Sequence, residues 1–126
     1  MRKNLYLSIL AISIIILCQS FSPESISVTE IPDDVNKVLI ASCYDCHSSD
    51  ARNKDAREAL NFEKWDDYRA TKKIGLLGDI CELVEKNKMP PEKYLDRNPD
   101  RKLTEKQKKL ICDWTAKESA KLMEGK

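Results

Sequence analysis

Cys43-Tyr44-Asp45-Cys46-His47 reads C-x-x-C-H, and this stretch decides how the rest of the chain is interpreted. The spacing is typical of the attachment site of a c-type haem. Two thiols form thioether bonds with the porphyrin, and the imidazole that follows them binds iron as an axial ligand. His47 is the single histidine of the chain. A C-x-x-C pair also occurs in dithiol redox sites and in zinc sites, and both stay open as alternatives.

The first twenty residues have the pattern of a targeting segment. Arg2 and Lys3 precede an apolar run over residues 5–17, and the residues up to Ser20 suit cleavage. The run is shorter than the ~20 residues of a comfortable membrane span. An uncleaved N-terminal anchor and a lipidated Cys18 are the alternatives to a cleaved signal peptide. All three predict that the rest of the chain lies outside the cytoplasm, in the periplasm or otherwise exported, and two of them attach it to the membrane.

The composition indicates one small, strongly charged domain. Charged residues make up 34% and aromatic residues 6% of the 126 residues, so the protein core alone is small. A buried porphyrin would supply the missing apolar core. Without residues 1–20, the chain keeps 20 of its 22 basic residues against 21 acidic ones. This balance gives no support for nucleic-acid binding, which usually shows a basic excess.

The hydrophobic periodicity predicts an all-α domain with four helices, over residues 34–43, 61–72, 76–88 and 104–122. Asp33 is the expected N-cap of the first helix, and Thr104 opens the last one in a capping box with Gln107. The Met89-Pro90-Pro91 stretch ends the third helix, because proline cannot continue it. Residues 48–59 are expected to be a loop or a solvated helical turn, and residues 94–101 a loop. The domain organisation is then 1–20 signal peptide or anchor, 21–32 linker, and 33–126 haem-binding domain.

From Cys43 onward the chain resembles a family of small bacterial haem-binding domains. The resemblance covers roughly residues 35–120 and rests on the C-x-x-C-H motif, on the stretch 60–65, and on Lys88-Met89-Pro90-Pro91 with Tyr94 downstream. It implies a monohaem c-type cytochrome domain with a class I cytochrome c-like fold, one covalent haem c attached to Cys43 and Cys46, and His47 as axial ligand. Relatives carry a segment rich in proline and tryptophan after the motif, whereas residues 49–55 are polar here. This difference puts in doubt how one side of the haem is covered.

Met89 is the best candidate for the second axial ligand. The chain has no other histidine, Met1 lies in the targeting segment, and Met123 lies near the C-terminus. Met89 is fixed between a helix end and two prolines, directly before the last helix. A core methionine, with a lysine, a water or an open position on the iron, is the alternative.

Several other residues have an open role. Cys81 and Cys112 either pair as a disulfide in an oxidising compartment or remain buried thiols. Four side chains could bind a haem propionate, with plain packing or solvation as the alternative: Trp65, Tyr68, Arg52 and Arg57. Four lysines could form a docking rim, or simply a solvated face: Lys72, Lys73, Lys86 and Lys88.

The leading functional hypothesis is an electron carrier that exchanges single electrons with redox partner proteins in the cell envelope, rather than an enzyme. The alternative is a gas-binding, sensor or peroxidase-like haem protein with an open distal site. A haem-free dithiol oxidoreductase is a third hypothesis, although no βαβ pattern surrounds the C-x-x-C pair.

Overall fold

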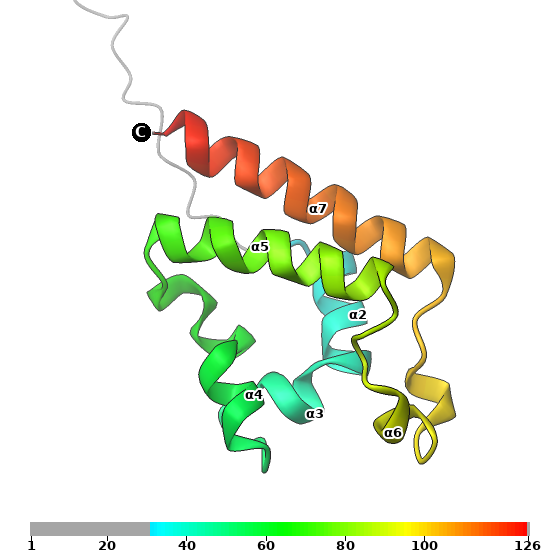
Figure 1. Cartoon of the computed structure of the whole chain (residues 1–126). Helices are drawn as coiled ribbons and strands as arrows, with labels where there is room; N and C mark the ends of the chain where they lie inside the picture. Colours follow the sequence, from blue (N-terminus) through cyan, green and yellow to red (C-terminus); the bar gives the residue numbers. More distant parts are fainter. Residues whose placement is uncertain (1–30, 126) are drawn as a thin grey trace, which may run out of the picture.

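The computed structural model describes residues 31–125, which form an all-α domain (Figure 1). No strand occurs in this part of the chain, so the predicted fold class is confirmed. The helices are α2 (Asp33–Ser42), α3 (Tyr44–His47), α4 (Lys54–Ala59), α5 (Ala70–Glu85), α6 (Glu92–Leu95) and α7 (Glu105–Glu124). Two short 3-10 helices, η1 (Phe62–Asp67) and η2 (Pro99–Arg101), complete the set. The predicted targeting segment and most of the predicted linker lie outside the described residues, and within residues 31–125 no helix is long and apolar enough to cross a membrane.

The pair formed by α5 and α7 is the framework of the domain. The two helices run antiparallel, side by side, at the top of Figure 1. Leu77 of α5 and Ile111 of α7 are fully buried, as their helical spacing predicts. A disulfide between Cys81 and Cys112 joins the two helices, which settles the question that the sequence left open. The helix α7 packs less extensively against α2, whose buried face carries Leu39.

The N-terminus of α2 differs from the expectation. Asp33 is not the N-cap, because the backbone N–H of Asn36 already donates to the carbonyl of Pro32, at 2.8 Å. Pro32 is therefore the N-cap, and Asp33 and Asp34 occupy the first turn. Carboxylates are stabilised there by the positive end of the helix dipole, which explains why an acidic pair suits this position as well as the cap.

The predicted helix over residues 61–72 is also wrong in part. The structure has the 3-10 helix η1, followed by extended backbone at Tyr68 and Arg69, and α5 then begins at Ala70. The break follows from burial of the aromatic side chains. Trp65 packs against Trp114 with ring centroids 5.7 Å apart, and the hydroxyl of Tyr68 accepts a hydrogen bond from the backbone N–H of Asn61 at 2.9 Å. A continuous α-helix would not deliver both contacts.

The expected third helix, over residues 76–88, begins earlier and ends earlier than its periodicity indicates, as α5 spans Ala70–Glu85. The expected loop or solvated helical turn over residues 48–59 contains the six-residue helix α4, and the expected loop over residues 94–101 contains the end of α6 and all of η2. The last helix agrees with the prediction. The side chain of Thr104 accepts from the backbone N–H of Gln107, and the Gln107 side chain accepts from the backbone N–H of Thr104, which is the predicted capping box.

Candidate functional site

A cavity of about 270 Å³ is lined by residues of α2, α3, α4 and α5 and by the segment that follows α5 and contains Met89. Its lining is largely aliphatic, aromatic and proline side chains, with Leu39, Phe62, Ile80 and Val84 among them. The four residues predicted to hold a haem, which come from distant parts of the chain, all line this one cavity: Cys43, Cys46, His47 and Met89. The fold therefore brings together the two halves of the predicted site.

His47 is held in a defined orientation by backbone carbonyls. Its Nδ1 lies 3.0 Å from the carbonyl oxygen of Leu60 and 3.1 Å from that of Ala56. A carbonyl can only accept a hydrogen bond, so Nδ1 must carry the proton. The Phe62 ring packs edge-on against the imidazole, with centroids 6.1 Å apart. The arrangement leaves the lone pair on Nε2, which is the tautomer that binds a metal.

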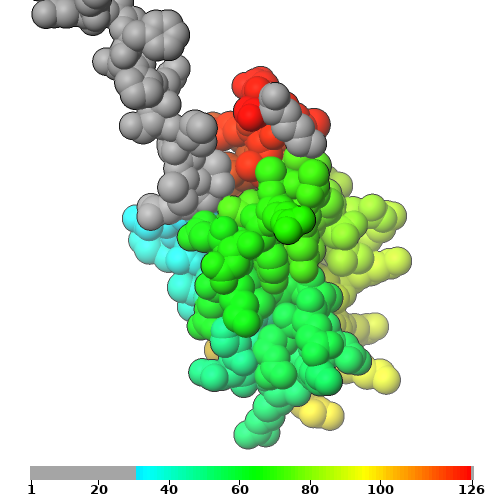
Figure 2. All heavy atoms as spheres, turned by 90° about the vertical axis from the view of Figure 1, so that its left-hand side faces the viewer, coloured from blue at the N-terminus to red at the C-terminus, as the bar shows by residue number. Residues whose placement is uncertain are grey.

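The carbonyls that hold His47 belong to the end of α4, which lies within the expected loop or solvated helical turn over residues 48–59. Asn53 caps α4, since its side chain accepts from the backbone N–H of Ala56 at 3.1 Å. With η1 and the start of α5, α4 forms the green face in Figure 2. An N-cap asparagine followed by an acid in the first turn is a recognised helix start, so Asn53-Lys54-Asp55 was the available signal. The carbonyls of Ala56 and Leu60 themselves leave no trace in a sequence.

The polar stretch after His47 is ordered by side-chain contacts with the backbone. Arg57 donates to the carbonyl of Ala51 at 2.8 Å, and the backbone N–H of Ser49 donates to the Glu63 carboxylate at 2.8 Å. Ala51 is buried, and Asn53 lines the cavity. In this chain, therefore, α4 and the turn before it form one wall of the cavity, to which Asn53, Ala56 and Ala59 contribute.

The two thiols are free cysteines at the end of α2 and within α3. Burial, together with the neighbouring Cys46, raises the pKa of Cys43 to about 12. Burial and Asp45 also raise the pKa of Cys46. Reactive dithiols depend on a lowered thiol pKa, and this site has the opposite property. Both thiols line the cavity, and their raised pKa values are the opposite of what a thiol–disulfide exchange site requires.

Met89 is placed by the way α5 ends. Asn87 adopts a left-handed conformation with φ of 54°. The backbone N–H of Asn87 donates to Val84, and that of Lys88 donates to Leu83 at 2.8 Å, which is the double hydrogen bond of a Schellman motif. The backbone N–H of Met89 also donates to Leu83, at 3.2 Å. Pro90 is buried directly after it. Because the backbone on both sides is fixed, the Met89 side chain has a defined starting point at the cavity wall.

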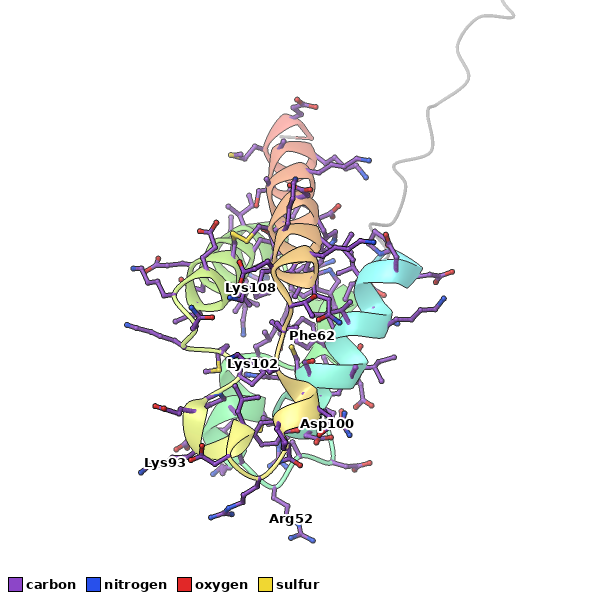
Figure 3. All side chains as sticks on the ribbon, turned by 90° about the vertical axis from the view of Figure 1, so that its right-hand side faces the viewer. Arg52, Phe62, Lys93, Asp100, Lys102 and Lys108 are labelled. Carbon is purple, nitrogen blue, oxygen red and sulfur yellow. A yellow bond between two sulfur atoms is a disulfide. The ribbon has the colours of Figure 1, made fainter. Side chains whose placement is uncertain are left out.

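Other candidates from the sequence lie away from the cavity. None of the four possible propionate partners lines it: Trp65 is buried in the core, Tyr68 bonds to Asn61, Arg57 bonds to Ala51, and Arg52 is exposed at the edge of the domain (Figure 3). Of the four lysines of the expected docking rim or solvated face, Lys73 is buried, and Lys72, Lys86 and Lys88 are exposed. Lys73 is buried beside Trp65, Lys72 lies over the Tyr68 ring, and Lys86 pairs with Glu82.

The residues around the cavity fit a haem. They combine an apolar lining, two unpaired thiols three residues apart, an imidazole whose Nε2 is free for iron, and a thioether on a separate segment. The sulfur and nitrogen donors match the axial and covalent ligands that c-type haem uses. A zinc site is less well served, because the donors do not form a cluster of three or more metal-binding side chains among the described residues.

Comparison with known proteins agrees with this assignment. The profile of a family described as haem-binding domain matches residues 51–117, a range that begins after the C-x-x-C-H motif and includes Met89. No curated protein and no solved structure matches the chain. Because the matched range spans more than half of the sequence, the chain belongs to the family of haem-binding domains.

Proposed function

We propose that the protein is a monohaem c-type cytochrome that carries single electrons in the cell envelope. In this proposal Cys43 and Cys46 hold one haem covalently, His47 binds the iron through Nε2, and Met89 is the second axial ligand. The observation that carries the proposal is the position of the His47 ring, whose Nδ1 is occupied by the carbonyls of Ala56 and Leu60 and whose Nε2 is left for iron.

Bound haem supplies a one-electron couple between ferric and ferrous iron. The residues of the chain do the rest. The apolar side chains of α5 exclude water from the cavity, the carbonyls at the end of α4 make the imidazole a stronger donor, and the Schellman motif presents the Met89 thioether. A thioether ligand raises the reduction potential of the haem iron, which suits a carrier that accepts electrons in the cell envelope.

The position of the protein in the cell is part of the proposal. Covalent attachment of haem in bacteria is completed outside the cytoplasm, and the basic and apolar pattern of residues 1–20 is typical of export. Redox partner proteins of the envelope are the expected partners. Cell fractionation with N-terminal sequencing of the haem-loaded protein tests this, and unprocessed haem-free protein in the cytoplasm would contradict it.

Two measurements test the haem proposal. Protein produced with haem-maturation machinery should have the mass of the chain plus one haem, and the haem should resist acid–acetone extraction. The variants Cys43→Ala and Cys46→Ala should each lose one thioether bond, which a pyridine haemochrome spectrum reports. Complete extraction of haem from the wild type would refute covalent attachment.

The second axial ligand decides between electron transfer and gas binding. Met89→Ala should abolish the far-red charge-transfer band of a methionine-ligated ferric haem, lower the reduction potential and let the ferrous protein bind carbon monoxide rapidly. Met123→Ala is the matched control, because Met123 is exposed near the end of α7. If the wild type already binds carbon monoxide rapidly and Met89→Ala changes nothing, the distal position is open, and a gas-binding or peroxidase-like function replaces the electron carrier.

A further inference from the structure

A hydrogen bond joins the two sides of the cavity. Asp45 stands between the two cysteines, in the first turn of α3, and Tyr94 belongs to α6, five residues after Met89. The hydroxyl of Tyr94 donates to a carboxylate oxygen of Asp45 at 2.6 Å, across 49 residues of sequence. Tyr94 also lines the cavity, whereas its neighbour Lys93 points to solvent (Figure 3). The thioether side and the thiol side of the site are thus in direct side-chain contact.

The Tyr94 end of this bond is rigid. Pro91 is the N-cap of α6, and its carbonyl accepts from the backbone N–H groups of Tyr94 at 2.9 Å and of Leu95 at 3.1 Å. The carbonyl of Tyr94 in turn accepts from the backbone N–H and the side chain of Asn98. Because only three residues separate Tyr94 from Pro90, a displacement of the tyrosine ring is passed to the segment that holds Met89.

The Asp45 end is fixed by the attachment motif. Asp45 lies between the two cysteines in sequence, and the backbone N–H groups of Cys46 and His47 donate to the carbonyl of Cys43 at 3.1 and 3.0 Å. When both cysteines are bonded to a cofactor, the turn between them can move only with that cofactor. The position of Asp45 is therefore fixed relative to the bound group. The hydrogen bond from Tyr94 to Asp45 then fixes the Met89 segment relative to that group.

We propose that Tyr94 is a positioning residue for Met89, which it holds over the cavity through its hydrogen bond to Asp45. This inference rests on the proposed function, since it concerns the same axial ligand. A short hydrogen bond from a neutral hydroxyl to a carboxylate is among the stronger ones in proteins, and tyrosine has few rotatable bonds to immobilise. A second contact acts in the same direction, as Arg101 of η2 donates to the carbonyl of Ala41 at the end of α2.

The ionisation of Tyr94 is compatible with this role. Burial, followed by the hydrogen bond and the charge of Asp45, raises the pKa of Tyr94 to about 12, and the nearby Arg101 opposes the rise. The hydroxyl consequently remains a donor throughout the physiological pH range. Phenylalanine at this position keeps the ring in the cavity wall and removes only the hydrogen bond.

The experiment compares Tyr94→Phe, which removes the donor, Asp45→Ala, which removes the acceptor, and the double variant with the wild-type haem-loaded protein. The readouts are the rate at which carbon monoxide binds the ferrous protein, which reports dissociation of Met89, and the far-red band of the ferric protein. Each single variant should bind carbon monoxide about fivefold faster, the factor that corresponds to one hydrogen bond of ordinary net strength. The double variant should be no faster than the singles, because both substitutions remove the same bond.

Controls separate positioning from general stability. Asp113→Asn removes a carboxylate that pairs with Lys109 on α7, far from the cavity, and should leave the carbon monoxide rate unchanged. A denaturant midpoint that falls in Tyr94→Phe while the carbon monoxide rate stays at the wild-type value would make the bond merely structural and overturn the inference. Additive effects of the two substitutions would overturn it as well.

Failure of the inference is distinguishable from failure of the proposed function. If Met89→Ala abolishes the far-red band while Tyr94→Phe and Asp45→Ala behave as wild type, Met89 is the ligand and Tyr94 does not position it. If Met89→Ala leaves the band unchanged, the proposed ligand is wrong, and the positioning role of Tyr94 falls with it.

Discussion

Removal of the disulfide between Cys81 and Cys112 should lower the free energy of unfolding by several kcal/mol without changing the haem site. The two cysteines are 31 residues apart in sequence. In the chain-entropy treatment, a closed loop of that length restricts the unfolded chain by about 12 cal/mol/K, or about 3.7 kcal/mol at 25 °C. A domain of this size has a total stability of only about 5–15 kcal/mol, so the loss is a large part of it.

The location of the disulfide predicts which properties stay constant. It joins α5 to α7, and neither cysteine lines the cavity, although their neighbours Ile80 and Ile111 do. The double variant Cys81→Ala/Cys112→Ala should therefore keep the spectrum and the reduction potential of the wild type. Unfolding in guanidinium chloride, followed by far-ultraviolet circular dichroism, measures the change in free energy.

Reduction provides the matched control. Dithiothreitol should destabilise the wild type by about the same amount and have no effect on the double variant. Alkylation of the denatured protein should label the peptides of Cys81 and Cys112 only after reduction. A difference in unfolding free energy below about 1 kcal/mol, or labelling of both peptides without reductant, would refute the reasoning.

Three further predictions concern single residues. Leu77→Ala removes a fully buried side chain between α5 and α7 and should cost about 2–5 kcal/mol, measured by chemical unfolding; a cost below about 1 kcal/mol would contradict the observed packing. Asn53→Ala removes the N-cap of α4 and should cost about 1 kcal/mol and speed hydrogen exchange at Ala56, whereas the conservative Asn53→Asp should not. Tyr94 should ionise near pH 12 in an ultraviolet titration, and at lower pH in Asp45→Asn, which lacks the carboxylate charge. Since the pKa of Tyr94 in the folded state lies above the ordinary value of 10, the stabilisation linked to it is complete below pH 10 and is lost as the pH rises through 12.

The parts of the fold that sequence reasoning anticipates are those governed by local rules. The capping box of Thr104 and Gln107 involves residues three apart, and the buried face of α5 repeats with the period of a helix. The bounds of α5 were harder to predict. Its first turn carries few apolar residues, so the start of the helix leaves little periodic signal. Its end depends on the left-handed conformation of Asn87, whereas the sequence argument for the end relied on Pro90 and Pro91.

The elements that were missed depend on contacts between distant residues. A helix of six residues such as α4 is too short to display a hydrophobic period, and it is held in place partly by the hydrogen bonds of its carbonyls with His47. The break before α5 depends on Trp65 packing against Trp114, which is 49 residues away in the sequence. Pairings of this kind exist only after the chain has folded, and no local pattern announces them.

The same distinction between local patterns and contacts of distant residues applies to the candidate site. The candidate donors can be named from the sequence, because two thiols followed by an imidazole at this spacing are typical of a haem attachment site. Their orientation cannot, because it is set by atoms that carry no specificity of their own: the carbonyls of Ala56 and Leu60 for His47, and the carbonyl of Leu83 for Met89. Two asparagines fix the backbone that orients these side chains. Asn53 starts the helix that ends in the carbonyls beside His47, and Asn87 closes the helix that precedes Met89.

This division has a consequence for which substitutions matter. A residue at a helix end can reorient an axial donor without touching the cavity, because the backbone that it fixes is the backbone that the donor extends from. Asn87 also accepts a hydrogen bond from Lys108 of α7 at 2.6 Å, so the end of α5 is tied to the start of α7 at the point where the Met89 segment leaves. The α5–α7 pair is thus the support of the thioether side of the site as well as the core of the domain, whereas the thiol and imidazole side depends on α4. The hydrogen bond between Tyr94 and Asp45 joins the two sides of the site. A change in the α5–α7 pair can therefore reach the thiol and imidazole side through this contact.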